Sequence, residues 1–382
     1  MQGKNKTVVF TGGGTGGHIY PGLAIADRLK SLNADYSIIW IGSNNGNDKK
    51  NVLSSYGTDN ETTCNKFIGI PSGKLRRYFS FQNFIDIFKI GFGLIAAFFI
   101  LLKIKPDFVF SKGGFVSVPP CAAAKLLKIP VYTHECDFSP GLATKINVKF
   151  AKKVLVSYEE TKDFFASNVK EKVLVMGNPI RDIFFNTEKQ IGFDFLALEK
   201  QEKPILLVLG GSSGAHQINE LIFENLGWLV EHFVVIHQTG KGDDFTTACE
   251  KQNNVSQGCY KAYDFIYSEM PHVLSCADVV LSRSGANSLW ECVATEKPMI
   301  LVPLAGSGTR GDQVENAQFF EKQGAALVLD SSKSIVELGN QLKLLIENSL
   351  DGNVLENMKK SLRQMAKENP ANLIAEFLVK GE

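Results

Sequence analysis

Short apolar runs, each followed by a glycine cluster and an amphipathic stretch, recur along the chain. The first run is Val8-Val9-Phe10, which stops at the glycines of 12–17 and leads into apolar residues at helical spacing. Continuous β-branched runs are typical of buried parallel strands, and a helix after each strand is typical of α/β folds. The pattern therefore predicts a strand, a tight turn and a helix at the start of the chain.

The same alternation predicts two doubly wound, Rossmann-like α/β domains that face each other across a cleft. The predicted strands are 37–42, 106–111, 129–133, 154–156 and 173–175 in the first half, and 204–209, 234–238, 278–282 and 297–303 in the second. Helices are expected near 334–348, 355–368 and 371–379. Gly177-Asn178-Pro179 resists helix formation and predicts a hinge, which divides the chain into domains 1–178 and 179–369.

Length and composition are those of a globular protein with two domains. The chain has 382 residues, with 44% hydrophobic and 21% charged residues. A net charge of +1 argues against a protein that binds nucleic acid through bulk charge. The seven cysteines form no C-x-x-C pair, which favours a reducing compartment and no zinc site. The first residues have no signal-peptide pattern, so we expect a cytoplasmic chain.

Glycine turns between a strand and a helix favour anion binding through backbone N–H groups. The opening turn contains G-x-G-x-x-G, but the tip of the second strand is Gly42-Ser43-Asn44-Asn45 and lacks the acidic residue that holds a nicotinamide dinucleotide's ribose. The turns 210–215 and 283–287 also place glycines and hydroxyls at helix starts, and there is no Asp-x-Asp pair for a metal. The sequence therefore favours a nucleotide-sugar site without a metal over a dehydrogenase or kinase site.

Polar residues at the ends of predicted parallel strands should converge at one edge of the first sheet. These are His18, the segment 113–115 and the segment 134–137. His18 is a candidate general base, with Glu135 and Asp137 as competing bases and a merely satisfied polar histidine as the alternative. Glu291, within the helix after the turn 283–287, is a candidate ribose ligand or else a solvated helix residue.

A basic and aromatic segment precedes the most apolar stretch of the chain. The apolar run Ile90–Leu102 is about 13 residues long, which is too short to span a bilayer and predicts a buried helix. Basic residues beside aromatic ones suit docking on an anionic membrane surface. The predicted docking residues are Lys74, Arg76, Arg77, Tyr78, Phe79 and Phe81.

An ordered set of motifs resembles one known family over nearly the whole chain. The motifs are TGGGTGGHIYPGLA, SKGGF, HECDFSPGLATK, GNPIR, GGSSGA, SRSGANSLWE and RGDQVENA. The set resembles the MurG family of peptidoglycan N-acetylglucosaminyltransferases, within glycosyltransferase family 28. The resemblance implies a GT-B fold and inverting transfer of N-acetylglucosamine from UDP-N-acetylglucosamine to the 4-hydroxyl of the muramyl sugar of lipid I, which forms lipid II. It implies no metal or other cofactor, a peripheral location on the cytoplasmic side of the inner membrane, and other cell-wall synthesis proteins as partners.

The resemblance also implies roles for individual residues. In the second half, Arg181 and Ser212 would meet the diphosphate, the backbone near Tyr267 and Met270 the uracil, and Glu291 the ribose, with Ala286, Asn287, Asp312 and Gln313 near the phosphates and sugar. Thr15, His18, Phe115 and Asp137 would line the acceptor side with Gly14, Gly113, His134 and Glu135, and Thr15, Gly16 and Gly17 also count as donor contacts. The last helix, 370–382, would return to the first domain.

The chain departs from the family pattern at three places. Cys136-Asp137 stands where glutamine-asparagine is usual, Ser213 replaces a glutamine, and Asp312 stands where a glutamine can contact the sugar. Asp137 is therefore an alternative to His18 as the base. Two other functions stay open: a UDP-sugar 2-epimerase with the same two-domain fold, and a nucleotide-sugar-binding subunit without catalysis.

Overall fold

The chain divides into two units, each built on a parallel sheet. The computed structural model describes residues 6–381 except 34, 45, 56–61, 74–80, 199–201, 211–213, 241–258, 307–309 and 350–352. Unit 1 comprises Met1–Asp182 and Glu368–Glu382, and unit 2 comprises Ile183–Lys367.

The sheet of unit 1 has seven strands in the order β3-β2-β1-β4-β5-β6-β7, and all pairings are parallel. The strands are β1 Lys6–Thr11, β2 Tyr36–Ser43, β3 Lys66–Ile70, β4 Phe108–Ser111, β5 Val131–Glu135, β6 Lys153–Val156 and β7 Val173–Val175. The chain order reverses between β1 and β4, the point at which open α/β sheets bind ligands. The two glycine turns of unit 1 follow these two strands.

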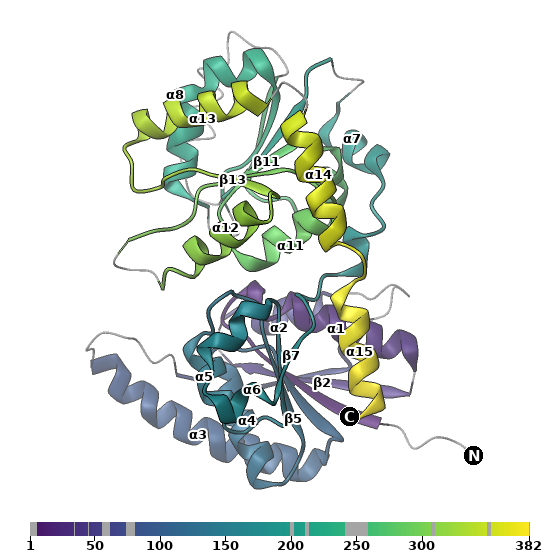
Figure 1. Cartoon of the computed structure of the whole chain (residues 1–382). Coiled ribbons are helices and arrows are strands. Elements are labelled where there is room, and N and C mark those ends of the chain that lie inside the picture. The colour runs from purple at the N-terminus through teal and green to yellow at the C-terminus, as the bar shows by residue number, and fades with distance from the viewer. Residues whose placement is uncertain are drawn as a thin grey trace. The chain divides into compact units, whose positions relative to one another are not determined.

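Helices cover both faces of this sheet (Figure 1). On one face, α1 (Tyr20–Leu32), the short α2 (Asp48–Leu53) and α15 (Pro370–Lys380) enclose a core with the side chains of β1, β2 and β4. On the other face, α3 (Phe81–Ile104), α4 (Val118–Leu126) and the segment after α5 (Leu142–Asn147) enclose a second core. The last helix of the chain thus packs against α1, in the first unit.

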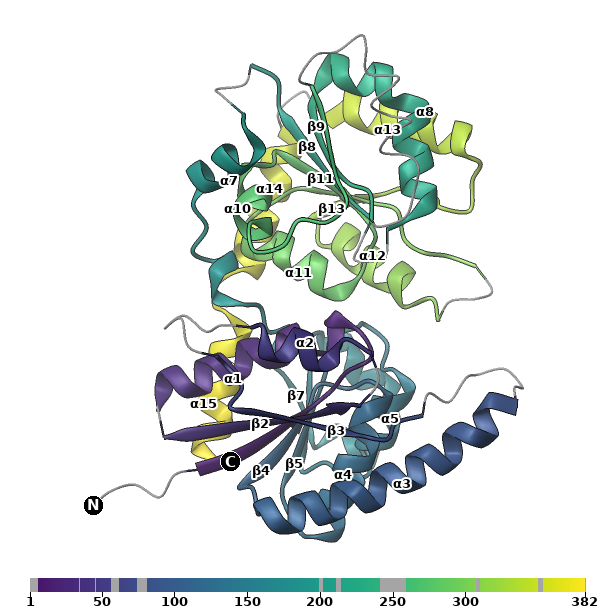
Figure 2. The same cartoon turned by 180° about the vertical axis from the view of Figure 1, so that it is seen from behind.

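Unit 2 repeats the scheme with six parallel strands in the order β10-β9-β8-β11-β12-β13. The strands are β8 Ile205–Leu209, β9 Val234–Gln238, β10 Tyr260–Tyr263, β11 Val279–Ser282, β12 Met299–Leu301 and β13 Ala326–Val328. The main helices are α7 Lys189–Leu196, α8 His216–His232, α10 Met270–Cys276, α11 Ala286–Ala294, α12 Asp312–Lys322, α13 Ile335–Ser349 and α14 Asn353–Met365. Helices α8 and α13 lie side by side over one face of the sheet (Figure 2).

The predicted doubly wound α/β class is confirmed, and three strands were not predicted from the sequence pattern. β3, β10 and β13 are all edge strands of their sheets. β3 and β10 are partly buried and each contains a lysine, so they lack the continuous apolar run by which the central strands were predicted. β13 is apolar but only three residues long, and the edge strand β7 was predicted.

The prediction of a buried helix over Ile90–Leu102 is wrong for one face of that helix. Ala97 and Leu101 of α3 are fully buried in the core, whereas Phe92 and Phe99 are each 63% exposed. Apolar residues occupy more of the circumference of α3 than the core covers, because α3 packs on α4 along one side alone.

Candidate active site

A buried carboxylate accepts a backbone hydrogen bond from the opening glycine turn. Asp48, the first residue of α2, is 4% exposed and accepts the backbone N–H of Gly14 at 3.0 Å and of Ser43 at 3.1 Å. A Cβ at Gly13 would overlap this carboxylate. Asp48, the acidic residue that follows β2, therefore stabilises the turn and does not bind a ribose. The sequence analysis did not assign this structural role.

His18 lies against the second glycine turn. It ends a short 3-10 helix, Gly16–His18, and a Cβ built at Gly114 would lie 3.0 Å from its Cδ2 atom. Gly113 and Gly114 have φ angles of +85° and +75°, which glycine alone adopts readily. The Phe115 ring packs against Gly14. The structure thus brings together His18, Gly14, Gly113 and Phe115, all four predicted from sequence.

The second turn is anchored by an asparagine that the sequence analysis missed. Asn147, at the end of α5, is buried and its Nδ2 donates to Ser111 Oγ at 3.0 Å and to Ser117 Oγ at 2.8 Å. Ser111 Oγ also accepts the Gly113 N–H at 3.2 Å, and Ser117 Oγ donates to the Gly114 carbonyl at 2.8 Å. These bonds fix the turn on which the His18 ring rests.

Glu135, at the end of β5, is used as a loop anchor. It is 5% exposed; its Oε1 accepts the N–H groups of Cys136 at 2.9 Å and Asp137 at 3.2 Å, and its Oε2 accepts the Gly141 N–H at 2.9 Å. Because both oxygens are engaged, the geometry favours a structural role. A contact with the acceptor, or a role as base, stays a prediction for Glu135.

His134 is buried behind the site rather than on its surface. Its Nε2 lies 2.9 Å from the Gly177 carbonyl, so the Nε2–H tautomer donates this bond. Burial, and next the charge of Lys112, hold the pKa of His134 well below its usual value, so the ring is neutral. His134 presents no exposed surface to an acceptor, and its predicted acceptor contact gains no support from the structure.

Asp137 follows at the partly exposed end of the same segment. Its carboxylate, the Cys136 sulfur and the Glu135 carboxylate each offer an atom within 4.8 Å of the others, a spacing that could hold a metal ion. However, burial raises the pKa of the Cys136 thiol to about 12, and both oxygens of Glu135 already accept backbone N–H groups. A divalent ion needs deprotonated, available ligands, so this trio does not fit one.

Arg181 lies beside the opening turn within unit 1. Its guanidinium carbon is 5.3 Å from the centroid of the Tyr20 ring, and that ring packs against Gly16. Thr15 is exposed at the same turn, and Gly17 follows it. The contact with Tyr20 lies within the first unit, and the predicted contact of Arg181 with the donor diphosphate stays a prediction.

Two helices of unit 2 begin side by side without a capping side chain. The N-cap residues are Ala215 for α8 and Gly285 for α11, and neither has a side chain that can accept a hydrogen bond. The preceding strands, β8 and β11, are neighbours whose last residues, Leu209 and Ser282, pair in register. Two helix N-termini that lack a side-chain cap therefore lie at one edge of the sheet, an arrangement that favours an anion. Ser212, predicted to contact the diphosphate, lies outside the described residues.

A network of buried, hydrogen-bonded side chains lies next to Gly214, just before α8. Asn219 on α8 donates from Nδ2 to the Thr239 carbonyl at 2.9 Å, and its Oδ1 lies 3.1 Å from His237 Nε2. His237 Nδ1 lies 3.1 Å from the Tyr260 hydroxyl. A Cβ at Gly214 would lie 2.7 Å from the Thr239 carbonyl, so the turn packs on this network. Burial lowers the pKa of His237 to about 3, and the neutral ring donates from Nε2 and accepts at Nδ1.

The turn before α11 is tied to α12. Ala286 is buried, while Asn287 and Glu291 are half-buried on α11. Asn316, a residue that the sequence analysis did not single out, donates from Nδ2 to the Ser284 carbonyl at 3.1 Å. This bond fixes the turn that positions the α11 N–H groups.

Arg283 joins three elements at the same edge. Its Nη1 donates to Gln217 Oε1 on α8 and to the Val302 carbonyl after β12, both at 3.0 Å. Desolvation lowers the pKa of Arg283 from its ordinary value, which reflects its half-buried place. Sequence reasoning gave it no role, although a basic residue at a strand end before a glycine turn is the signal that could have identified it.

The first two residues of α12 contact residues that precede the helix. Asp312 pairs with Arg310 at 2.6 Å, and Gln313 Oε1 accepts the Leu304 N–H at 3.0 Å. Both side chains, predicted to lie near the donor sugar, are half-buried.

The predicted uracil segment precedes α10. Tyr267 is 62% exposed, and its carbonyl accepts the Met270 N–H at 3.4 Å. Gln238 Oε1 accepts the Ile266 N–H at 2.9 Å and ties this segment to the end of β9.

The predicted membrane-docking cluster lies mostly outside the described residues. This holds for Lys74, Arg76, Arg77, Tyr78 and Phe79, and Phe81 is the first residue of α3 with its side chain undescribed. The following helix carries an exposed apolar stripe at spacings of three and four residues, made of Phe84, Phe88, Phe92, Ile95, Phe99 and Leu102. The stretch Asp86–Ile104 is long and apolar enough to cross a membrane by length and composition, and 17% of it is buried.

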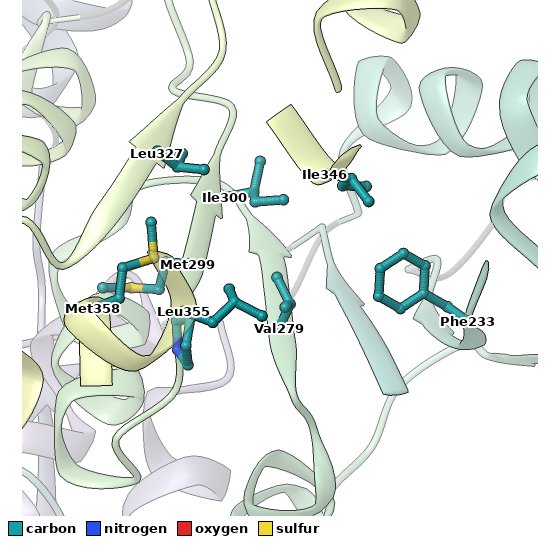
Figure 3. A pocket seen from close by; sticks show the side chains of 9 residues that line it. Phe233, Val279, Met299, Ile300, Leu327, Ile346, Leu355 and Met358 are labelled. Atoms are coloured by element: carbon teal, nitrogen blue, oxygen red, sulfur yellow. The ribbon is translucent and has the colours of Figure 1, made fainter. Parts of the chain in front are cut away.

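A small cavity in unit 2 is a gap in core packing and not a site. It measures about 10 Å³ and lies among Val279, Ile300, Ile346 and Leu355, with only apolar side chains around it (Figure 3). A space of this size is at the lower limit for one water molecule and offers no polar partner.

Two parallel-sheet α/β units with glycine turns at their strand ends give the chain the architecture of the GT-B class. The chain belongs to glycosyltransferase family 28: residues 8–156 match the family's N-terminal domain and residues 205–376 its C-terminal domain.

Known proteins match this chain along almost its full length. The chain is 52% identical over 381 residues to the UDP-N-acetylglucosamine--N-acetylmuramyl-(pentapeptide) pyrophosphoryl-undecaprenol N-acetylglucosamine transferase of Treponema denticola, covering 98% of this chain and 97% of that protein. The crystal structure of Acinetobacter baumannii MurG matches with a TM-score of 0.73 at 25% identity, covering 98% and 99%. The UDP-GlcNAc 2-epimerase of Neisseria meningitidis shares the fold, with a TM-score of 0.66 at 14% identity over 98% and 99%.

Proposed function

We propose that this chain transfers N-acetylglucosamine from UDP-N-acetylglucosamine to the 4-hydroxyl of the muramyl sugar of lipid I, which forms lipid II for peptidoglycan synthesis. The observation that carries the proposal is the pair of uncapped helix N-termini, of α8 and α11, at adjacent strand ends of unit 2. The proposal is also supported by the 52% identity of this chain to a transferase named for that reaction.

In this proposal unit 2 holds the donor. The N–H groups and the positive dipole ends of α8 and α11 neutralise the diphosphate as it departs, so no metal is needed. Glu291 holds the ribose, the backbone at Tyr267 and Met270 holds the uracil, and Asn287 with Gln313 lies near the sugar. Ser212 and Arg181 add to the phosphate contacts.

Unit 1 holds the acceptor and supplies the base. The base takes the proton of the acceptor 4-hydroxyl while that oxygen attacks the anomeric carbon on the face opposite UDP. The new C–O bond forms as the bond to the UDP oxygen breaks, which inverts the configuration. His18 is the first candidate because its ring rests on the fixed turn at Gly113 and Gly114. Asp137, partly exposed two residues after β5, is the second.

The location proposed is the cytoplasmic face of the inner membrane, with the chain bound peripherally through α3. The exposed stripe on α3 gives an apolar face to the lipid, and the preceding basic cluster would add attraction to anionic headgroups. The opposite side of α3 belongs to the core at Ala97 and Leu101, so a spanning helix would have to leave that core.

A UDP-sugar 2-epimerase is the second candidate, because a known epimerase shares the fold. An epimerase would convert the nucleotide sugar with no acceptor present, whereas a binding subunit would convert nothing.

The deciding experiment incubates the purified chain with UDP-[14C]-N-acetylglucosamine in excess EDTA, with and without a lipid I analogue. We expect label in the lipid and release of one UDP per sugar transferred, only with the acceptor. Formation of an epimeric UDP-sugar without acceptor would support the second candidate. Activity that returns only on adding Mg²⁺ or Mn²⁺ would contradict the metal-free donor site.

A further inference from the structure

Asn147 is a buried asparagine that joins α5 to the second glycine turn. The residue is 0% exposed, and its Nδ2 donates to Ser111 Oγ at 3.0 Å and to Ser117 Oγ at 2.8 Å. Both serines are fully buried as well. Because Ser111 precedes the two glycines and Ser117 follows them, one amide group supplies a hydrogen bond to each end of the turn.

The direction of these bonds is set by the serine hydroxyls. Ser117 donates its one hydroxyl hydrogen to the Gly114 carbonyl at 2.8 Å, so its oxygen can only accept from Asn147. Ser111 Oγ accepts the Gly113 N–H at 3.2 Å in addition to the bond from Asn147. An aliphatic side chain at position 147 would therefore leave two buried hydroxyl oxygens without this donor, which is unfavourable.

Helix α5 also connects the turn to the loop that Glu135 anchors. The helix begins directly after Gly141, whose N–H donates to Glu135 Oε2 at 2.9 Å, and it ends at Asn147. Between these ends, Thr144 Oγ1 would lie 3.8 Å from a Cβ built at Gly113. The short helix is thus held at both ends, and its last residue fixes the turn relative to the Glu135 loop.

The His18 ring lies against the part of the turn that these bonds hold. A Cβ built at Gly113 would lie 3.6 Å from His18 Nδ1, and one built at Gly114 would lie 3.0 Å from His18 Cδ2. Two successive glycines have more conformational freedom than any other backbone pair. The turn therefore depends on its side-chain hydrogen bonds to present one fixed surface to the ring.

We propose that Asn147 is a positioning residue for sugar transfer: its two hydrogen bonds hold the second glycine turn in the conformation that orients the His18 ring toward the acceptor hydroxyl. Asn147 acts through the turn, since a fully buried side chain has no surface to offer a substrate. The catalytic meaning rests on the proposed transferase function with His18 as its base. The effect on the His18 ring does not depend on activity.

A double-mutant cycle tests the catalytic part. In Asn147→Leu, which keeps a similar side-chain size and removes the donors, we expect kcat to fall at least tenfold while KM for UDP-N-acetylglucosamine stays within twofold. In a His18→Ala background the same change should alter kcat less than twofold, because the ring to be oriented is gone. A smaller loss in the wild-type background, or an equal fold-loss in both backgrounds, would overturn the proposal.

The matched control is Asn225→Leu on α8 of unit 2. Asn225 is also a buried asparagine, 8% exposed, and its Nδ2 donates to the Leu221 carbonyl at 2.8 Å. This variant should lower the melting temperature and leave kcat within twofold of the wild type. A tenfold fall of kcat in the control would attribute the loss in Asn147→Leu to general destabilisation and count against the proposal.

A readout on the histidine ring needs no activity. The chain has six histidines, so in protein with 15N-labelled histidine the His18 signals are assigned by their loss in His18→Ala. We expect these signals to shift in Asn147→Leu, while those of His237 in unit 2 stay in place. Unshifted His18 signals would overturn the proposal. Shifted signals in a protein that transfers no sugar would instead reject the proposed function and retain the positioning of the ring.

A milder variant covers a failure of Asn147→Leu to fold. Ser117→Ala removes one oxygen atom, and with it the bonds to Asn147 Nδ2 and to the Gly114 carbonyl. We expect kcat to fall at least fivefold and the His18 signals to shift in the same direction as in Asn147→Leu. A loss of kcat below fivefold in folded Ser117→Ala would contradict the proposal.

Discussion

Gly114 shows how far the candidate site depends on the absence of a side chain. Its backbone has φ +75° and ψ 156°, and a Cβ would lie 2.6 Å from the Gly13 carbonyl and 3.0 Å from the His18 ring. Neither the carbonyl nor the ring is the end of a flexible side chain that could move aside freely. The two glycine turns and the histidine are therefore one packed unit.

We predict that Gly114→Ala destabilises the protein by about 1–3 kcal/mol and lowers kcat, because the turn is strained and the His18 ring displaced. Thermal unfolding and steady-state kinetics measure the two effects. The matched control is Gly227→Ala on α8, where no atom lies within 4 Å of the built Cβ and the substitution should stabilise by roughly 0.5–1 kcal/mol. Unchanged stability in Gly114→Ala would show that the turn can adapt.

The choice of base is also decided at single residues. If His18 is the base, His18→Ala should reduce kcat by about 10²–10⁴-fold and leave UDP affinity near the wild-type value. Calorimetric titration with UDP separates binding from catalysis. If instead Asp137→Ala causes the larger loss of kcat, Asp137 is the base and His18 only packs against the turn.

At the scale of elements, α3 is the helix whose two faces have different roles. One face packs on α4 and the sheet (Figure 2). The other face carries the exposed apolar stripe. The Gly93 backbone lies close to Pro71 and Pro119 on the packed side, which fixes the rotation of the helix. The packing of α3 within unit 1 therefore keeps the apolar stripe exposed to solvent.

We predict that Phe92→Ser and Phe99→Ser each weaken binding to vesicles of anionic phospholipid by roughly tenfold, since each removes about 1–2 kcal/mol of apolar burial in lipid. Flotation on a sucrose gradient measures the bound fraction, and UDP affinity should not change. The control is Val336→Ser on α13 of unit 2, a residue 73% exposed and outside the stripe. Equal flotation of all variants and wild type would reject α3 as the docking face.

At the scale of the whole molecule, each unit contains a histidine buried in its neutral form, His134 in unit 1 and His237 in unit 2. The folded pKa of His237 is about 3, against an ordinary value of 6.5. The unfolded chain therefore binds a proton between these pH values while the folded chain does not. Stability from this residue is fully present above pH 6.5 and is lost as pH falls toward 3.

We predict that unit 2 loses about 2 kcal/mol of stability from His237 between pH 7.5 and pH 5, at a slope approaching 1.4 kcal/mol per pH unit. Hydrogen exchange of the β8 and β9 amides, corrected for the intrinsic pH dependence, reports unit 2 separately from unit 1. In His237→Gln the slope in unit 2 should be smaller. The same slope in both proteins would show that His237 is not the titrating group.

How much of the site could be predicted depends on how far apart in the sequence the interacting residues lie. The glycine turns, His18 and Phe115 were predicted because a strand, a glycine cluster and a helix follow one another in the chain. The partners that hold them were not, since Asp48 lies 34 residues from Gly14 and Asn147 lies 36 residues from Ser111. Glu135 was predicted as an acceptor or base residue, and only its N–H partners indicate a loop anchor.

The fold class, the order of the central strands along the chain, the position of the glycine turns and the family could all be predicted from the sequence. These features depend on local backbone preference, hydrophobic periodicity and the order of motifs. The three-dimensional packing, in contrast, was needed to show which strands lie at the edges, which face of α3 is exposed, and that Lys112 is buried. Those features depend on strand register and on packing between distant segments, and nearby residues in the chain do not encode them.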